Sequence, residues 1–278
     1  MRKVILTKIK EAMYKNLSLD NFTTLLVVIS FLFMGSMPTM AQNEDDENTK
    51  KWNFVAAPYL LLPTMQGNVA INDIPIEVDA SPGDIFNVLE GGLMLFFEAS
   101  NSKWAVNMDI LYMKLGEAGT TPILGRTAEL EIKQLGLTFN GLYRVAPWAE
   151  VGIGGRFNSI EQSAEIAGVG NTPGDILPGR FVSMKETWFD PLLVARVMTR
   201  FDGSQWRLGM LADIGGFGVG SDLAWQINPF VGYQFSKLFE IDLAYRWLSM
   251  DYESGADSNY FKYDMLISGP EIGFLFHF

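Results

Sequence analysis

The stretch Phe239-Glu-Ile-Asp-Leu-Ala-Tyr-Arg-Trp247 alternates between two kinds of side chain. Its odd positions are aromatic or aliphatic, whereas its even positions carry Glu240, Asp242 and Arg246 around a single alanine. Because successive side chains of a β-strand point to opposite faces, this period of two is typical of a strand with one apolar and one polar face. The stretch therefore predicts a strand whose two faces meet different surroundings.

The same period extends from Trp52 to the end of the chain, in segments separated by clusters of Gly, Asn, Asp, Ser or Pro, and no long helical pattern interrupts it. The predicted strand segments are 52–64, 90–100, 103–115, 127–144, 147–159, 186–201, 205–217, 223–235, 238–251 and 260–278. We therefore predict an all-β fold, an antiparallel up-and-down barrel of about ten strands, within a range of about 8–12.

Alternation alone leaves two kinds of barrel open, because a soluble barrel buries its apolar face and a membrane barrel turns that face to lipid. The connections between segments alternate between short and long. The short ones read NSK, VAP, DGSQ and SK, and the long ones span 65–89, 116–126, 161–185 and 252–259. Short periplasmic turns and longer external loops are typical of transmembrane barrels, so the sequence predicts a transmembrane barrel.

One external connection, within Asp213-Ile-Gly-Gly-Phe-Gly-Val-Gly-Ser-Asp222, is brief. Its glycines suggest a phosphate-binding loop, which would need a helix directly after them. The residues that follow, LAWQINPFVGYQF, keep a period of two instead. We therefore predict a tight hairpin at this position.

Aromatic residues open or close the segments at one end of the predicted barrel, where a membrane interface selects amphipathic rings. The predicted periplasmic girdle consists of Trp52, Trp104, Tyr143, Trp148, Phe201, Trp206, Phe235, Phe239 and Phe278. A second aromatic set is expected at the opposite interface and consists of Tyr112, Phe217, Trp225, Trp247 and Tyr263.

The polar face of the segments is poor in lysine and mixes charges of both signs, which predicts ion pairs in a narrow interior. The predicted lumen-facing charges are Glu98, Asp109, Glu150, Arg156, Asp190, Arg196, Arg207, Asp213, Glu240, Asp242, Arg246, Asp264 and Glu271. Two interpretations remain open: a structural network that closes the lumen, or a lining whose acidic excess favours cations. Ten strands leave little room for a wide channel.

Some residues break the pattern. Pro191, Pro229 and Pro270 fall inside strand segments, and we expect β-bulges there because proline removes a ladder donor. The alternation also slips by one near Gly269 and near Gln134. The long connection 65–89 predicts a small external hairpin followed by one helical turn at 83–89.

The first residues are typical of an export signal. A basic stretch precedes the apolar run 25–34, which is too short for the ~20 residues of a spanning helix, and small residues lead to Ala41. We predict a cleaved signal peptide at 1–41, an acidic disordered leader at 42–51 and a barrel domain at 52–278.

The C-terminal strand GPEIGFLFHF resembles the signature by which the barrel assembly machinery recognises its clients, carried by Ile272, Phe274, Phe276 and Phe278. Together with WNFVAAPYLLLP, WFDPLLVARV and GGFGVGSDLAWQINPFVGYQFS, it is similar to a family of small, largely uncharacterised outer-membrane β-barrel proteins of Gram-negative bacteria. The resemblance covers about residues 50–278. It implies a location in the cell outer membrane, reached through the periplasm, and contact with outer-membrane lipid, and it transfers no catalytic residues.

Composition narrows the function classes. The chain has no cysteine, so thiol catalysis and thiolate metal sites are excluded. Its net charge is −11, and cleavage at 41 would remove five basic and two acidic groups, so nucleic acid is not an expected partner. The single histidine, His277, lies at the periplasmic end facing the lumen, which disfavours an enzyme. We expect no cofactor and no metal, although Asp251, Glu253 and Asp257 could form a weak loop Ca²⁺ site.

These observations predict an outer-membrane barrel with a structural or surface-interaction role, whose lumen is filled by paired charges. Its long loops, chiefly 161–185, would contact an external ligand whose identity the sequence does not reveal. The alternative is a narrow, weakly cation-preferring pore for small solutes. A lipid-acting outer-membrane enzyme ranks third.

Overall fold

The computed structural model describes residues 51–278, apart from 72–73, 124–125, 167–179, 202 and 257–259. The predicted signal peptide, 1–41, and leader up to residue 50 lie outside the described residues, as do Asp257 and the middle of the 161–185 loop. Within the described part of the chain, no helix is long and apolar enough to cross a membrane.

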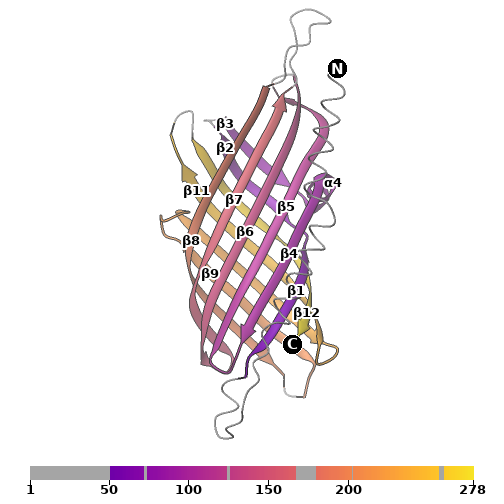
Figure 1. Cartoon of the computed structure of the whole chain (residues 1–278), viewed down its shortest axis with the longest axis vertical. Helices are drawn as coiled ribbons and strands as arrows, with labels where there is room; N and C mark the ends of the chain where they lie inside the picture. Colours follow the sequence, from indigo (N-terminus) through magenta and orange to yellow (C-terminus); the bar gives the residue numbers. More distant parts are fainter. Residues whose placement is uncertain (1–50, 72–73, 124–125, 167–179, 202, 257–259) are drawn as a thin grey trace, which may run out of the picture. The chain divides into compact units, whose positions relative to one another are not determined.

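Ten antiparallel strands form a closed barrel (Figure 1). They are β1 (Asn53–Leu61), β4 (Leu89–Ser100), β5 (Trp104–Ile123), β6 (Arg126–Ala146), β7 (Ala149–Ile166), β8 (Arg180–Arg200), β9 (Trp206–Gly216), β10 (Leu223–Gln234), β11 (Phe239–Ser254) and β12 (Phe261–His277). Each pairs with the next member of this series, and β1 pairs with β12 to close the ring. The predicted barrel of about ten strands is confirmed.

The closing seam lies between the first and last strands of the barrel. Val55 pairs with His277, and the ladder continues to Leu61 opposite Glu271. Beyond β12, the Phe278 amide donates to the Phe54 carbonyl at 2.9 Å and the Phe54 amide donates to the Phe278 carbonyl at 3.2 Å. The terminal residue therefore completes the seam at the end of the barrel where the short turns lie.

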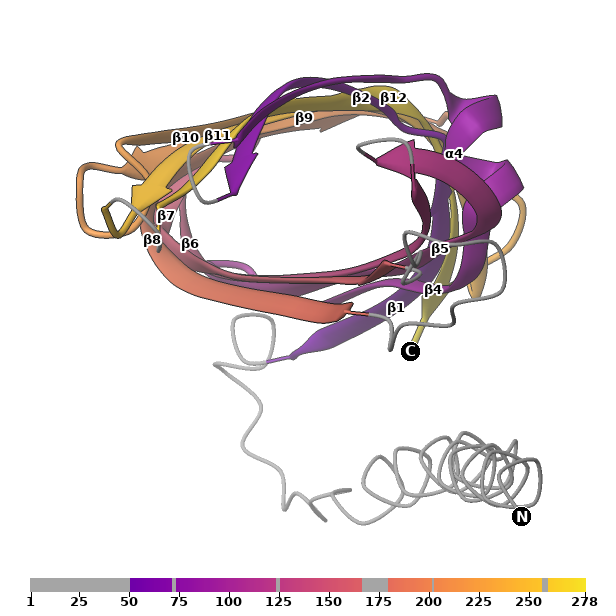
Figure 2. The same ribbon diagram turned by 90° about the horizontal axis from the view of Figure 1, so that it is seen from above.

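The connection between β1 and β4 forms the predicted external hairpin and helical turn. Strands β2 (Thr64–Ile71) and β3 (Ile74–Ala80) pair with each other, and β2 adds to the half of β12 that lies away from the short turns. Helix α4 (Pro82–Val88) follows, contacts β3 and β5, and lies at one side of the ring when the barrel is seen from above (Figure 2). Ser81 and Asp84 form a capping box at its first turn, and Pro82 occupies a first-turn position, where its missing N–H costs nothing.

The ten barrel strands turn their apolar faces outward over most of their length. Ile153, Leu193 and Leu243, from three different strands, are 70%, 56% and 54% exposed. Such exposure of large aliphatic side chains in a closed barrel fits lipid and not water. In the half of these strands nearest the short turns, polar residues point into the lumen, so the predicted facing of Leu243 and Arg246 agrees with the structure.

The predicted bulges at Pro191, Pro229 and Pro270 are wrong. Pro229 pairs with Met210 and Pro270 with Tyr245 without a register shift, and Pro191 likewise stays in register with β7. A proline removes one donor but inserts no extra residue, so the neighbouring pairs keep the ladder aligned. Register shifts occur instead at the strand ends, between residues 89 and 91, 117 and 121, and 144 and 146.

The slips in alternation near Gly269 and Gln134 are not β-bulges either, because the β11–β12 and β6–β7 ladders keep their register there. On β12 the odd positions face inward from Phe261 to His277, and Tyr263 is buried inside the barrel at 3% exposure. Asp264 therefore lies on the outer face, where it pairs with Asp251 of β11. Both Tyr263 and Asp264 were misplaced because the half of the lumen away from the short turns is apolar, so the apolar side of β12 turns inward there.

Candidate functional site: the barrel lumen

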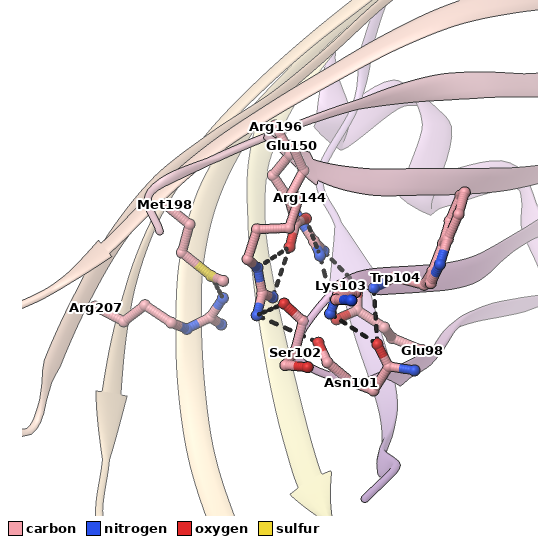
Figure 3. A network of polar contacts seen from close by, with 10 residues as sticks. All are labelled: Glu98, Asn101, Ser102, Lys103, Trp104, Arg144, Glu150, Arg196, Met198 and Arg207. Carbon is pink, nitrogen blue, oxygen red and sulfur yellow. Dashed lines mark hydrogen bonds and ion pairs between the residues drawn. The ribbon is translucent and has the colours of Figure 1, made fainter. Parts of the chain in front are cut away.

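Ion pairs cross the lumen near the end of the barrel where the short turns lie (Figure 3). Arg196 on β8 binds Glu98 on β4 and also contacts Glu150 on β7, with 2.6 Å between its Nη2 and Oε2 of Glu150. Arg144 on β6 contacts the other oxygen of Glu150 at 2.7 Å and donates to the carbonyl of Asn101 at 3.2 Å. Because β4 and β8 are not neighbours, this network holds distant walls together.

A second cluster surrounds Glu240 on β11. Arg207 on β9 contacts Glu240 at 2.6 Å and Asp242 at 2.5 Å, and its guanidinium lies 4.6 Å from the centre of the Phe230 ring. His277 Nε2 lies 3.2 Å from Oε2 of Glu240, and Arg200 contacts the same oxygen at 3.3 Å. The single histidine thus takes part in a polar cluster on the inner wall.

Two further arginines lie closer to the middle of the barrel. Arg246 contacts Asp109 at 2.8 Å and Glu271 at 2.9 Å, and the Tyr59 hydroxyl donates to Asp109 at 2.6 Å. A separate pair joins Arg156 on β7 to Asp213 on β9 through Nη2, at 2.9 and 3.0 Å. Arg156 and Asp213 are both buried, so each charge depends on its partner.

Asp190 has no arginine partner among the described residues and is compensated by hydrogen-bond donors. Its carboxylate accepts from the side chains of Asn158 and Trp188 at 3.0 and 3.1 Å. It also accepts from the Ser221 amide at 2.6 Å and the Ser221 hydroxyl at 3.1 Å. These hydrogen bonds compensate the buried carboxylate, so Asp190 anchors the β9–β10 hairpin to the inner wall.

This hairpin is the glycine-rich stretch that the sequence predicted as a turn. Gly216 and Gly218 have φ of +85° and +74°, and Phe217 between them has φ of +53°. A Cβ at Gly216 would overlap the backbone oxygen of Ser221, so the turn needs glycine there. No helix follows, and the Phe217 side chain is 55% exposed on the outside.

Apolar side chains fill the half of the lumen that lies away from the short turns. We call them the apolar plug, and its buried members are Tyr59, Leu61, Val69, Leu111, Met113, Ile160, Trp188, Ala224, Leu248, Met250, Phe261, Tyr263, Met265 and Ile267. Trp188 on β8 stacks on Tyr252 of β11 with 4.2 Å between ring centroids, and Gln134 on β6 donates to the Tyr263 hydroxyl at 3.3 Å. These contacts reach across the barrel.

A cavity of about 260 Å³ lies below the plug. Inward side chains of nine of the ten barrel strands line it, from Tyr59, Asp109 and Arg246 near the plug to Asn53, Arg200 and His277 at the far end. Asn53 and Arg200 are exposed at the strand ends that carry the short turns. The cavity therefore opens at that end of the barrel.

The structure places the predicted lumen-facing charges as follows. All of them lie on the inner wall except Asp264, which faces outward. The residues brought together in ion pairs or hydrogen-bonded clusters are Glu98, Asp109, Glu150, Arg156, Asp190, Arg196, Arg207, Asp213, Glu240, Asp242, Arg246 and Glu271. Sequence reasoning missed Arg144 and Arg200, although both share the parity of inward residues on their strands.

The predicted girdle residues all lie at the end of the short turns. Eight are exposed and Phe239 is half-buried. Neighbouring rings contact one another, as Trp104 and Tyr143 do edge to face with centroids 4.9 Å apart, and Phe239 and Phe276 with centroids 5.5 Å apart. The residues of the predicted assembly signal, Ile272, Phe274, Phe276 and Phe278, share the outward face of the last strand.

The proposed Ca²⁺ ligands do not form a described site. Asp257 lies outside the described residues, and Glu253 pairs with Lys262 at 2.7 Å. Among the residues that the structure describes, no group of three or more His, Asp or Glu side chains is arranged to hold a metal ion.

A closed antiparallel barrel with an apolar outer surface, an aromatic girdle and a polar, ion-paired inner wall is typical of transmembrane β-barrel proteins. The chain is an integral β-barrel protein of the bacterial outer membrane.

No protein-family model and no curated protein matches this sequence. Solved structures with a similar barrel include the outer membrane protease OmpT from Escherichia coli, which is 9% identical over 87% of this chain and 100% of that chain, with a TM-score of 0.49. The translocator domain of autotransporter NalP from Neisseria meningitidis is 12% identical over 81% and 88% of the two chains, with a TM-score of 0.39. Ail of Yersinia pestis, in complex with a heparin analogue, is 11% identical over 82% and 98%, with a TM-score of 0.36.

Proposed function

We propose that this protein is a closed outer-membrane barrel with a structural or surface-interaction role. The apolar plug carries this proposal. Its side chains come from strands all around the ring and pack into one buried cluster, so hydrated ions meet a dry layer in the external half of the lumen. The ion pairs beneath it cross-link distant walls and favour a rigid body over a channel.

The external end supports a role in surface contact. A transmembrane strand needs about 9–11 residues, whereas β5, β6, β7 and β8 have 20, 21, 18 and 21. These strands rise beyond the rest of the barrel at the end opposite the C-terminus (Figure 1).

Charged residues on the outer face of these strands mark where lipid contact ends. Lys114 contacts Glu131 at 2.9 Å, and Lys133 contacts Glu131 at 2.8 Å and Glu161 at 3.5 Å. Because charges facing hydrocarbon are costly, this row belongs in the headgroup layer or in water. The wall above it is thus available to a partner outside the cell.

Planar-bilayer recording tests the closed lumen. We expect purified protein to show no conductance steps, whereas combined Trp188→Ala and Met265→Ala substitutions thin the plug and open a pathway. Leu193→Ala, on the outward face of β8, is the matched control and should stay silent. Reproducible cation-selective steps from the unmodified protein would replace this proposal with the narrow pore.

Surface labelling tests the external wall. The chain has no cysteine, so single substitutions give unambiguous labelling. Ser183→Cys on the exposed face of β8 should react with a membrane-impermeant maleimide on intact cells, whereas Ser236→Cys in the β10–β11 turn should react only after the outer membrane is opened. The reverse pattern would invert the topology and remove the basis for surface contact.

We further propose that the protein is not a lipid-acting enzyme. His277 faces Glu240 on the inner wall, away from the lipid-facing surface where an acyl substrate would lie. Replacing His277 with Ala should leave the lipid composition of the outer membrane unchanged. Loss of a lipid modification in that variant would overturn this proposal.

A further inference from the structure

The cavity below the apolar plug has the dimensions of a small-ligand site. Its volume of about 260 Å³ lies just below the ~300–1,000 Å³ that is usual for ligand pockets. The plug closes it on one side, and it opens at the end where the short periplasmic turns lie. A ligand would therefore enter from the periplasm.

The charges around the cavity are held in ion pairs, and one carboxylate oxygen, Oδ1 of Asp242, is buried there without a hydrogen-bond donor. Arg196 binds Glu98, Arg207 binds Asp242, and Arg246 binds both Asp109 and Glu271. A charged ligand would have to displace one of these partners and leave a buried charge uncompensated. The inner wall therefore disfavours ions and favours an uncharged guest.

Four carboxamide side chains supply polar groups that are not used up by the barrel. Gln226 and Asn228 on β10 line the cavity, and among the described residues the amide nitrogen of Asn228 is buried without a hydrogen-bond partner. Asn140 donates one hydrogen bond to Asn107 at 2.9 Å, and this leaves the Asn107 amide nitrogen and the Asn140 oxygen unpaired. Buried polar groups without partners are uncommon, and each one calls for an explanation.

These amides face the cavity from opposite walls. Three strands separate β10 from the β5–β6 pair in one direction around the ring, and four separate them in the other. Apolar side chains of Phe96, Leu211 and Leu275 complete the lining. The cavity thus offers hydrogen-bond donors and acceptors on two sides and C–H surface between them.

We propose that this cavity is a periplasm-facing binding site for a small uncharged polyhydroxylated molecule, of the size of one sugar ring. Each hydroxyl group both donates and accepts, as the carboxamides require, and the C–H faces of a sugar pack against apolar side chains. No net charge is needed, so the ion pairs of the inner wall remain intact.

Isothermal titration calorimetry of the purified full-length barrel in detergent tests the proposal, with D-glucose as the probe. Glucuronate and glucosamine, which have the same ring but carry a charge, are the comparison ligands. We expect saturable binding of glucose and at least tenfold weaker binding of both charged sugars. Absence of saturable heat with glucose would mean that the cavity holds water only, and equal binding of the charged sugars would refute the charge argument.

Two variants locate the site. Gln226→Leu combined with Asn228→Leu keeps side-chain size and removes no hydrogen bond seen in the barrel, so the fold should persist while glucose affinity falls at least tenfold. Ile227→Leu, between them on the outward face, should bind like the unmodified protein. Ala244→Leu fills the cavity with bulk and should also abolish binding. Unchanged affinity in the double variant, or in a folded Ala244→Leu protein, would overturn the assignment.

Discussion

Arg246 on β11 and Asp109 on β5 meet across the lumen, with 2.8 Å between Nη1 and Oδ2. The two residues are 137 positions apart in the sequence, and their strands are not neighbours in the ring. The same guanidinium contacts Glu271 and lies 5.0 Å from the centre of the Tyr59 ring. One arginine therefore links β5, β11 and β12 inside the barrel.

Removing this arginine should destabilise the barrel strongly. Arg246→Met leaves the carboxylates of Asp109 and Glu271 buried without their cation, at a cost of about 3–5 kcal/mol in the free energy of unfolding. Denaturant unfolding in micelles measures the loss. Lys262→Met breaks the exposed pair with Glu253 and should cost less than about 1 kcal/mol. Similar losses in both variants would contradict the importance of the lumen pair.

The cost of placing an arginine on the lipid-facing surface should depend on its depth in the membrane. Leu243 is 54% exposed on the outward face of β11, so Leu243→Arg should cost about 2–4 kcal/mol and impair insertion. Leu238, in the β10–β11 turn at the girdle, is 65% exposed, and Leu238→Arg should cost about 1 kcal/mol or less. Folding titrations in lipid vesicles compare the two. Equal costs would mean that the outward face of β11 does not meet hydrocarbon.

Alanine substitutions in the glycine-rich β9–β10 hairpin distinguish the cost of a positive φ from the cost of a steric clash. Gly216 and Gly218 both have positive φ, but only at Gly216 would a Cβ also overlap a neighbouring backbone atom. Gly218→Ala meets open space and should cost about 1 kcal/mol, whereas Gly216→Ala should cost clearly more. Thermal unfolding followed by circular dichroism ranks the two variants. The opposite order would show that the turn relaxes around the new side chain.

The pKa of Asp84 makes the N-terminal capping of α4 depend on pH. The hydroxyl of Ser81, and then its backbone amide, hydrogen-bond to the Asp84 carboxylate and lower its pKa below the ordinary 3.8. A depressed pKa means that the capping contribution is fully present above the ordinary value and is lost as the pH falls through the lowered one. An NMR titration should show this low midpoint, and Ser81→Ala should raise it part of the way towards the ordinary value, because the backbone amide of residue 81 still donates to the carboxylate. An unchanged midpoint in that variant would exclude the Ser81 hydroxyl as a cause of the lowered pKa.

The terminal phenylalanine combines two roles that can be separated. The backbone of Phe278 closes the seam with Phe54, whereas its side chain belongs to the predicted assembly signal. Deleting Phe278 removes both, but Phe278→Ala keeps the backbone hydrogen bonds. We expect both variants to accumulate less in the outer membrane, and only the deletion to lower the unfolding temperature of protein refolded in detergent. Normal accumulation of the Phe278→Ala variant in the outer membrane would show that the Phe278 side chain is not needed as an assembly signal.

The period of two in a single stretch, Phe239–Trp247, was sufficient to predict the strand, its two faces and, repeated along the chain, a barrel of about ten strands. Local chemistry also predicted the β9–β10 hairpin, the external hairpin and the helical turn. These features depend on neighbours in sequence: alternation, turn glycines and a capping serine. They needed no knowledge of which strands face one another across the lumen.

The partners inside the lumen were decided only by the tertiary structure. Alternation shows that Arg246 and Asp109 point inward, but their distance depends on the closure and register of the ring. The apolar plug was missed for the same reason, because a period of two does not distinguish an apolar face turned to lipid from one turned to a packed interior. Tyr263 and Asp264 were placed on the wrong sides at that boundary. The sequence by itself determined which residues alternate, whereas the fold decided what each face meets, because burial depends on the strands brought opposite.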